Sequence, residues 1–185
     1  MSAPHDPQPW PLLSSRQGPD LVICRARFDR LRNPRTGAAF DRLVLEAPDW
    51  VNVIAVTPER EVVLVKQYRF GTGAVALEIP GGVLDPGEDS RAAAERELRE
   101  ESGFTAQRWR YLGSVQANPA FLTNTCHHWL AEDARRTESE LALDEGEDIA
   151  VELVPAADLP AYVADGRIAH SLVVAALARW IDLRA

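Results

Sequence analysis

The sequence predicts an α+β fold in which a mixed sheet is covered by helices. Two β-branched runs, residues 50–57 and 61–68, have the composition of central strands. A polar helix is expected to begin at Asp89 or Ser90, which can cap it, and to end at Gly103. Mixed strands, one helix, more strands and two terminal helices form an order that fits an α+β fold or an α/β/α sandwich.

Length and charge restrict the classes of function. The 185 residues suffice for one domain, and 46% hydrophobic and 26% charged residues are typical of a globular core. A net charge of -8 argues against non-specific binding of nucleic acid and against a polybasic membrane contact. The start of the chain does not resemble a signal peptide, and no apolar run could span a bilayer. We therefore expect a cytoplasmic protein without a nucleic-acid or membrane partner.

The chain is expected to have three parts. Residues 1–20 hold five of the thirteen prolines and should form an irregular tail. Residues 21–46 should form a small β-hairpin-like segment, and residues 47–185 the main domain. The strands and helices expected besides those named above are strands 21–29, 40–46, 76–79, 109–115, 127–131 and 149–154, and helices 156–164 and 168–183.

Three carboxylates share one side of the central helix. Glu97, Glu100 and Glu101 fall within an arc of about 100°, because residues three and four apart lie on the same face. Neighbouring like charges repel, and the repulsion grows near a cleft of low dielectric. Mg²⁺ or Mn²⁺ would reverse the sign, since both ions prefer oxygen ligands and bridge to phosphate oxygens. The alternative interpretation is a solvated Glu/Arg face.

The carboxylates stand in a fixed sequence frame. Gly82 is followed after five residues by Glu88, and after seven more by Arg96; Gly103 closes the frame. This pattern resembles the Nudix box, G-x5-E-x7-R-E-U-x-E-E-x-G-U, in which U is a bulky apolar residue. The remaining positions of the box are also met, by Glu97, Leu98, Glu100, Glu101 and Phe104. The resemblance implies a Nudix-type α/β/α sandwich and a metal-dependent hydrolase.

The resemblance also assigns roles to residues of the box. It implies two or more Mg²⁺ or Mn²⁺ ions, held by Glu97, Glu100, Glu101 and the backbone carbonyl of Gly81. Arg96 is expected to pair with Glu88 and so to fix the loop to the helix. Gly82 and Gly103 complete the structural positions of the motif.

Segments outside the box resemble one branch of the family, the ADP-ribose pyrophosphatases and nucleoside-diphosphate-sugar hydrolases. Pro119 lies sixteen residues after Gly103, a spacing similar to that branch's marker. Further likeness lies in residues 65–69, 77–82, 144–149 and 166–168. The branch implies hydrolysis of the diphosphate in ADP-ribose or a nucleotide sugar, giving a nucleoside monophosphate and a sugar phosphate. It also implies a homodimer, with residues 21–46 at the interface.

The same branch suggests catalytic and substrate-binding residues. A loop carboxylate would activate water, and the matching position is Glu145, with Glu147 as its rival; Glu100 is grouped with them as catalytic. The candidate substrate-binding residues are Arg69, Glu78, Arg35, Trp50 and Pro119. Arg69 could fork two phosphate oxygens, and Arg35 could reach a neighbouring subunit's site. Trp50 could stack on a base, although a tryptophan at the start of a central strand also suits a core.

Two alternative functions stay open. The first is a Nudix hydrolase that acts on nucleoside triphosphates or dinucleoside polyphosphates, against which Pro119 and the acidic loop argue. The second is a non-catalytic Nudix domain that binds a nucleotide and regulates a partner. The intact Arg96 and the three helix carboxylates argue against it, because a silent domain would be free to lose them.

Overall fold

The computed structural model describes residues 6–143 and 145–184. Two compact units emerge from its contacts. The first runs to Ala47 and takes in Gln116–Asn124, and the second comprises Pro48–Val115 and Thr125–Ala185. In the described residues every helix is too short or too polar to span a bilayer.

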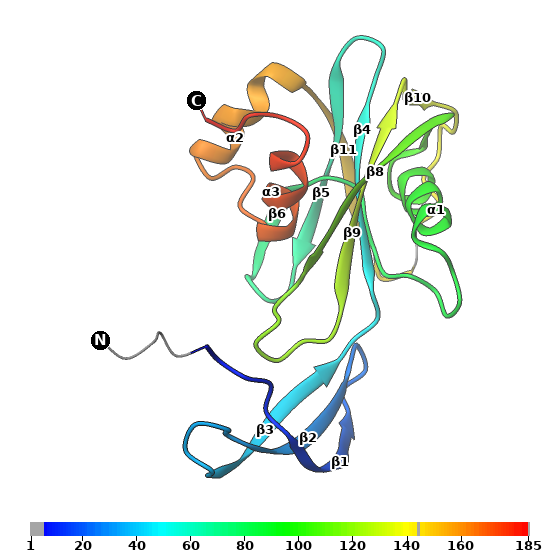
Figure 1. Cartoon of the computed structure of the whole chain (residues 1–185). Coiled ribbons are helices and arrows are strands. Elements are labelled where there is room, and N and C mark those ends of the chain that lie inside the picture. Colours follow the sequence, from blue (N-terminus) through cyan, green and yellow to red (C-terminus); the bar gives the residue numbers. More distant parts are fainter. Residues whose placement is uncertain (1–5, 144, 185) are drawn as a thin grey trace. The chain divides into compact units, whose positions relative to one another are not determined.

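The first unit contains an antiparallel sheet in the order β1-β2-β3 (Figure 1). Its strands are β1 Leu12–Asp20, β2 Arg25–Arg32 and β3 Ala39–Glu46. The expected irregular tail is therefore wrong for residues 12–20. A register shift between Gln17 and Asp20 accommodates Pro19, because a proline cannot donate to the ladder. Residues 21–24 form the turn that joins β1 to β2, so β2 begins later than expected.

The second unit is built on a six-stranded mixed sheet in the order β11-β5-β4-β9-β8, with β6 paired to β5. Its strands are β4 Trp50–Val56, β5 Glu61–Arg69, β6 Ala74–Glu78, β8 Arg108–Gln116, β9 Thr125–Glu132 and β11 Ile149–Pro155. Strands β4 and β9 run parallel, whereas β5 pairs antiparallel with β4, β6 and β11. A second small ladder joins β7 Phe104–Thr105 to β10 Arg135–Arg136.

Helices cover both faces of this sheet. Alternate residues of β4 point to opposite sides: Val53 packs in the core under α1 Ser90–Ser102, and Ile54 packs with α2 Leu159–Ala164 and α3 Ser171–Ala178. Within this unit, Figure 1 shows α1 on one face and α2 and α3 on the other. The predicted α/β/α sandwich with a mixed sheet is confirmed.

The two terminal helices are shorter than expected. The helix expected over 156–164 begins as a 3₁₀ turn, η1 Ala156–Asp158, before α2. The helix expected over 168–183 is confined to α3. Ile168 is instead held in a loop, where its N–H donates to the carbonyl of Tyr162 at 2.9 Å and its side chain is buried in the core.

Candidate active site

Both ends of α1 are fixed as the sequence predicts. The Asp89 side chain caps the helix, accepting hydrogen bonds from the N–H groups of Arg91 at 2.9 Å and Ala92 at 3.1 Å. At the other end Gly103 has φ 72°, and its N–H donates to the Arg99 carbonyl. The face with Leu98 packs on the sheet, so the neighbouring carboxylates lie at the edge of the core.

A glycine loop lies between α1 and the start of β4. The N–H of Val51 donates to the Gly82 carbonyl at 2.9 Å, and that of Val53 to the Pro80 carbonyl at 2.8 Å. A Cβ at Gly82 would collide with the carboxylate of Glu97. Glycine is therefore required for the loop to approach the helix carboxylates so closely.

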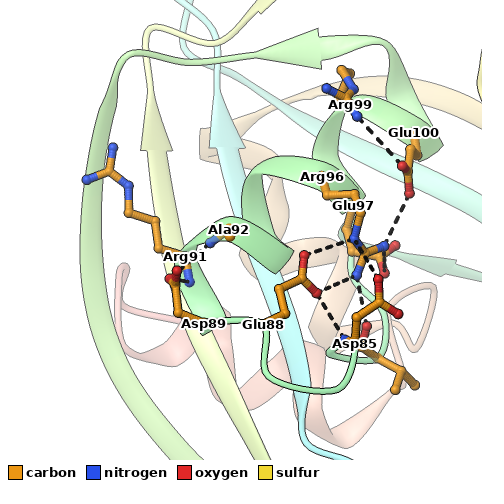
Figure 2. A network of polar contacts seen from close by, with 10 residues as sticks. Asp85, Glu88, Asp89, Arg91, Ala92, Arg96, Glu97, Arg99 and Glu100 are labelled. Atoms are coloured by element: carbon orange, nitrogen blue, oxygen red, sulfur yellow. Dashed lines mark hydrogen bonds and ion pairs between the residues drawn. The ribbon is translucent and has the colours of Figure 1, made fainter.

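Arg96 organises the polar network of the helix (Figure 2). Its Nε and Nη2 donate to the two oxygens of Glu88 at 3.1 and 3.0 Å, and Nη2 also donates to the Val83 carbonyl at 3.0 Å. Nη1 donates to Glu97 at 2.8 Å and to Glu100 at 3.2 Å. The hydrogen bonds from Arg96 lower the pKa of Glu88. The expected pairing of Arg96 with Glu88 is present, and it connects the loop to the helix.

Two of the helix carboxylates are buried. Glu101 is 3% exposed, Glu97 is 8% exposed, and the N–H of Gly81 donates to Glu101 at 2.9 Å. Burial raises the pKa of Glu101 to about 8, despite the hydrogen bond from Gly81. Burial also raises the pKa of Glu97, which the charge of Arg96 partly opposes. The site therefore contains two buried carboxyl groups whose ionised forms its own residues do not fully stabilise.

The donor chemistry of this cluster fits a hard divalent cation. Carboxylate and carbonyl oxygens are the ligands that Mg²⁺ and Mn²⁺ prefer, and a cation would relieve the burial of Glu97 and Glu101. In the described part of the chain, however, no three His, Cys, Asp or Glu side chains are gathered around one metal position. Arg96 draws Glu97 and Glu100 to its guanidinium, while Glu101 turns to Gly81.

The two candidate loop carboxylates differ in their surroundings. Glu145 is exposed in a turn. Glu147 is half-buried, and its negative charge helps to raise the pKa of Glu97 and of Glu101. Glu147 therefore lies in the electrostatic environment of the site. The sequence held a signal for this: Glu147 precedes the buried Ile149 by two residues, the spacing that puts side chains on one face of an extended chain.

A cavity of about 750 Å³ borders the glycine loop on the side of α3. Gly81, Gly82 and three of the predicted substrate-binding residues, Trp50, Arg69 and Glu78, help to line it. Asn52 and His170, which the sequence reasoning missed, line it too. Asn52 is buried, and its Nδ2 has no hydrogen-bond partner among the described residues. A polar residue inside the β-branched run 50–57 was the available signal; nothing comparable marked His170.

Glu78 connects two basic side chains of the cavity. Its carboxylate accepts from Arg69 Nε at 3.0 Å and Nη2 at 2.9 Å, and Nδ1 of His170 lies 3.4 Å from its Oε2. Burial would raise the pKa of Glu78, but the contacts with His170 and Arg69 outweigh it and lower the pKa to about 2.

Two predicted substrate-binding residues belong to the first unit. Arg35 is exposed in a turn, where its N–H donates to Asn33 Oδ1 at 2.8 Å. Pro119 is also exposed, in the turn between Asn118 and Phe121. Their contact with a substrate stays a prediction.

Comparison with known proteins agrees with this geometry. Residues 48–176 match the NUDIX domain family. Over 155 residues the chain is 33% identical to a methanol dehydrogenase activator of Bacillus methanolicus, covering 84% of this chain and 83% of that protein. It is 32% identical over 155 residues to an ADP-ribose pyrophosphatase of Mycobacterium tuberculosis, covering 83% and 74%. An ADP-ribose pyrophosphatase of Bacillus subtilis is 36% identical over 115 residues, 62% of each chain.

A solved structure gives the same fold. The crystal structure of an ADP compounds hydrolase superposes with a TM-score of 0.81, covering 95% of this chain and 94% of that one, at 23% identity. The family match spans well over half of the chain and includes α1, the glycine loop and the cavity residues Arg69 and Glu78. This protein belongs to the Nudix family.

Proposed function

We propose that this chain hydrolyses the diphosphate bridge of a nucleoside diphosphate-linked compound, such as ADP-ribose or a nucleotide sugar. The products would be a nucleoside monophosphate and a sugar phosphate. The observation that carries the proposal is the complete set of box carboxylates on α1, beside a cavity that contains an arginine held by a carboxylate. The names of the two ADP-ribose pyrophosphatase relatives support the substrate class.

The residues divide the chemistry between them. When bound by Glu97, Glu100, Glu101 and the Gly81 carbonyl, two or more Mg²⁺ or Mn²⁺ ions would neutralise phosphate charge and make water more acidic. Arg96 donates hydrogen bonds to Glu97 and Glu100 and so fixes their positions relative to the glycine loop. Arg69 gives Nε and Nη2 to Glu78, which leaves Nη1 for a phosphate oxygen.

A carboxylate is also needed to take the proton of the attacking water. Glu147 is better placed than Glu145, because its charge acts on Glu97 and Glu101. We assign it the role of general base. Glu145, which is exposed in its turn, is the alternative candidate for this base.

We also propose a homodimer with the first unit at the interface. Large apolar side chains of this unit are exposed, among them Val22 at 97%, Ile23 at 80% and Leu12 at 57%. Exposed apolar side chains concentrated in one small unit are typical of an interaction surface. Size-exclusion chromatography with light scattering at micromolar concentration should give about twice 20.4 kDa. A mass of one chain would contradict the proposal.

Action on a protein partner is the second candidate function. It is favoured by the relative named as a methanol dehydrogenase activator, which matches most of this chain. The two candidates differ in what the purified chain can do alone. Turnover of a nucleotide without any partner supports the hydrolase, whereas nucleotide binding without turnover supports the regulator.

A substrate screen tests the proposal. The purified chain should be incubated with ADP-ribose, ADP-glucose, GDP-mannose, UDP-glucose and diadenosine polyphosphates, with Mg²⁺ or Mn²⁺, and the products identified. We expect cleavage of at least one of the first four to a nucleoside monophosphate and a sugar phosphate. E97Q should remove the activity, and E95Q is the matched control, since Glu95 is exposed on the same helix and, among the described residues, pairs with Arg91. Cleavage of the dinucleotides alone would overturn the proposed substrate class.

A further inference from the structure

The wall of the cavity contains a polar cluster drawn from three elements. Glu78 ends β6, Arg69 ends β5, and His170 immediately precedes α3. All three line the cavity. Glu78 is only 3% exposed, although it is a carboxylate. A buried carboxylate is retained only where partners offset its desolvation.

Both oxygens of Glu78 already have partners. Arg69 donates to Oε1 and Oε2, and His170 approaches Oε2. Arg69 thus occupies part of the acceptor capacity of Glu78, and His170 faces one of the same oxygens. The role of Glu78 is to orient the two basic side chains beside it, so we treat it as a positioning residue.

Glu78 also determines where His170 carries its proton. Nδ1 of His170 is buried, lies 3.4 Å from Oε2 of Glu78, and has no hydrogen-bond partner among the described residues. The separation exceeds an ordinary N–H···O bond of about 2.9 Å, and such contacts commonly tighten when a substrate binds. A carboxylate can face this nitrogen favourably only if the proton lies between them. In the neutral form of the ring Nε2 is then left as a hydrogen-bond acceptor, whereas in the imidazolium both nitrogens donate.

An acceptor in the cavity selects a particular part of the substrate. The diphosphate of the proposed substrates offers acceptor oxygens only. Their donors are the sugar hydroxyls and the exocyclic amino group of the base. We propose that His170 binds the substrate in its neutral form and that its Nε2 accepts a hydrogen bond from one of these donors, which makes His170 a substrate-binding residue. The inference rests on the proposed function, because that function defines the substrate class.

Asn52 supports a ligand in this cavity independently. Its buried Nδ2 has no hydrogen-bond partner in the described part of the chain, and it lies on β4, away from Glu78 and His170 in the sequence. A buried donor without a partner is unfavourable, because it has lost its hydrogen bond to water. A ligand that accepts a hydrogen bond from Asn52 would satisfy this group. The cavity therefore offers both an acceptor and a donor.

Two substitutions of similar size separate substrate binding from a structural role. In H170N the side-chain amide can still donate to Glu78, but no atom remains at the position of Nε2. In H170Q the longer side chain carries its carbonyl oxygen towards that position. We expect H170N to lower kcat/KM for the preferred substrate about tenfold, the value of one lost hydrogen bond. We expect H170Q to recover most of the loss. Equal values for the two variants, at wild-type level or below it, would overturn the assignment.

Substrate analogues identify the donor. If ADP-ribose is the substrate, inosine diphosphate ribose lacks the amino group, and the deoxy analogues each lack one sugar hydroxyl. The penalty of H170N should disappear for the analogue that lacks the donor and persist for the others. A penalty that persists with every analogue would contradict a direct contact.

The inference can fail separately from the proposed function. If the wild-type chain cleaves none of the diphosphates, the proposed function is wrong. In that case, calorimetry measures the affinity of each variant for ADP-ribose without added metal, and H170N is again compared with H170Q. Affinity about tenfold weaker in H170N than in H170Q supports the contact, and equal affinities, or no binding by any form, overturn it. Melting temperatures of both variants should match that of the wild type, which excludes a folding defect.

Discussion

Glu101 combines burial with a role that requires negative charge. Its pKa is about 8 in the folded chain and 4.5 in a solvated carboxyl. The folded state therefore holds a proton there that the unfolded chain releases above pH 4.5. This contribution to the free energy of unfolding is fully present below pH 4.5 and is lost as the pH rises through 8. A divalent cation would reverse the trend, because it binds the ionised form.

The substitution E101Q tests this charge balance. Without metal, the wild type should lose a few kcal/mol of stability relative to E101Q between pH 4.5 and 8. Urea denaturation in the presence of a chelator measures the difference. E101Q should also lose most of the stabilisation that Mg²⁺ gives the wild type. A pH-independent difference between the two proteins would show that Glu101 stays ionised throughout.

The two loop carboxylates give a second prediction at this scale. E147Q should lower kcat by about two orders of magnitude or more, since general bases typically contribute 10²- to 10⁴-fold. E145Q should change kcat by less than about threefold, because Glu145 is exposed. Steady-state kinetics with the preferred substrate compares them directly. The reverse order would return the base to Glu145, the position favoured by sequence alone.

At the residue scale, the sequence predicted those contacts that follow from the spacing of residues along the chain. The box places Glu88 against Arg96 and puts the three carboxylates on one helix face, and the structure contains these contacts. The sequence favoured Glu145 over Glu147 as the base, and this choice stays a prediction, because loop conformation decides which of the two turns inward. It also missed His170, whose contact with Glu78 spans 92 residues of sequence and depends on tertiary folding.

The central helix shows how far local signals extend at the scale of elements. Asp89 and Gly103 predicted its limits, and both caps form. Substituting D89A should cost about 1 kcal/mol of unfolding free energy, because two helix N–H groups lose their acceptor. D89S keeps an acceptor and should cost little. Urea denaturation of both variants checks this, and a D89A protein as stable as D89S would contradict it.

The elements that were mispredicted depend on distant partners. Strand β1 was expected to be irregular because residues 1–20 hold five prolines, yet β2 supplies a pairing edge and a register shift accommodates Pro19. The last helix was predicted to be too long, because an apolar residue such as Ile168 can be buried from a helix or from a loop. Its backbone instead bonds to Tyr162 and its side chain enters the core. Secondary-structure propensity alone cannot show where contacts with distant residues override it.

At the scale of the second unit, one loop borders both parts of the site. Gly81 and Gly82 line the cavity, and they also contact Glu101 and Glu97 of α1. The β-branched run of β4 predicted a central strand, and the sandwich built around it brings the cavity and the carboxylates to a common loop. The sequence could not place the cavity itself, since residues from β4, β5, β6 and the α3 loop meet there only after folding.

The loop glycines give a prediction that separates folding from function. A Cβ at Gly81 would collide with the Val51 backbone carbonyl, whereas a Cβ at Gly82 would meet the movable Glu97 side chain. G81A should therefore destabilise the chain by about 2 kcal/mol or more, in the range of overpacking. G82A should keep most of the stability but lose activity, because Glu97 is displaced. Thermal melts check the predicted stabilities of both variants, and kcat measurements check the predicted loss of activity. Equal effects of the two substitutions on stability would contradict the prediction.

The account depends most on cleavage of a diphosphate bridge by this chain alone. The direct measurement is ³¹P NMR of ADP-ribose incubated with the purified protein and Mg²⁺, with E97Q and E95Q in parallel. We predict that the diphosphate signals are replaced by those of AMP and ribose 5-phosphate with the wild type and E95Q, but not with E97Q. If ADP-ribose stays intact with a folded wild-type protein, the same experiment with ADP-glucose, GDP-mannose and UDP-glucose completes the test. Intact diphosphates in all four would contradict the account.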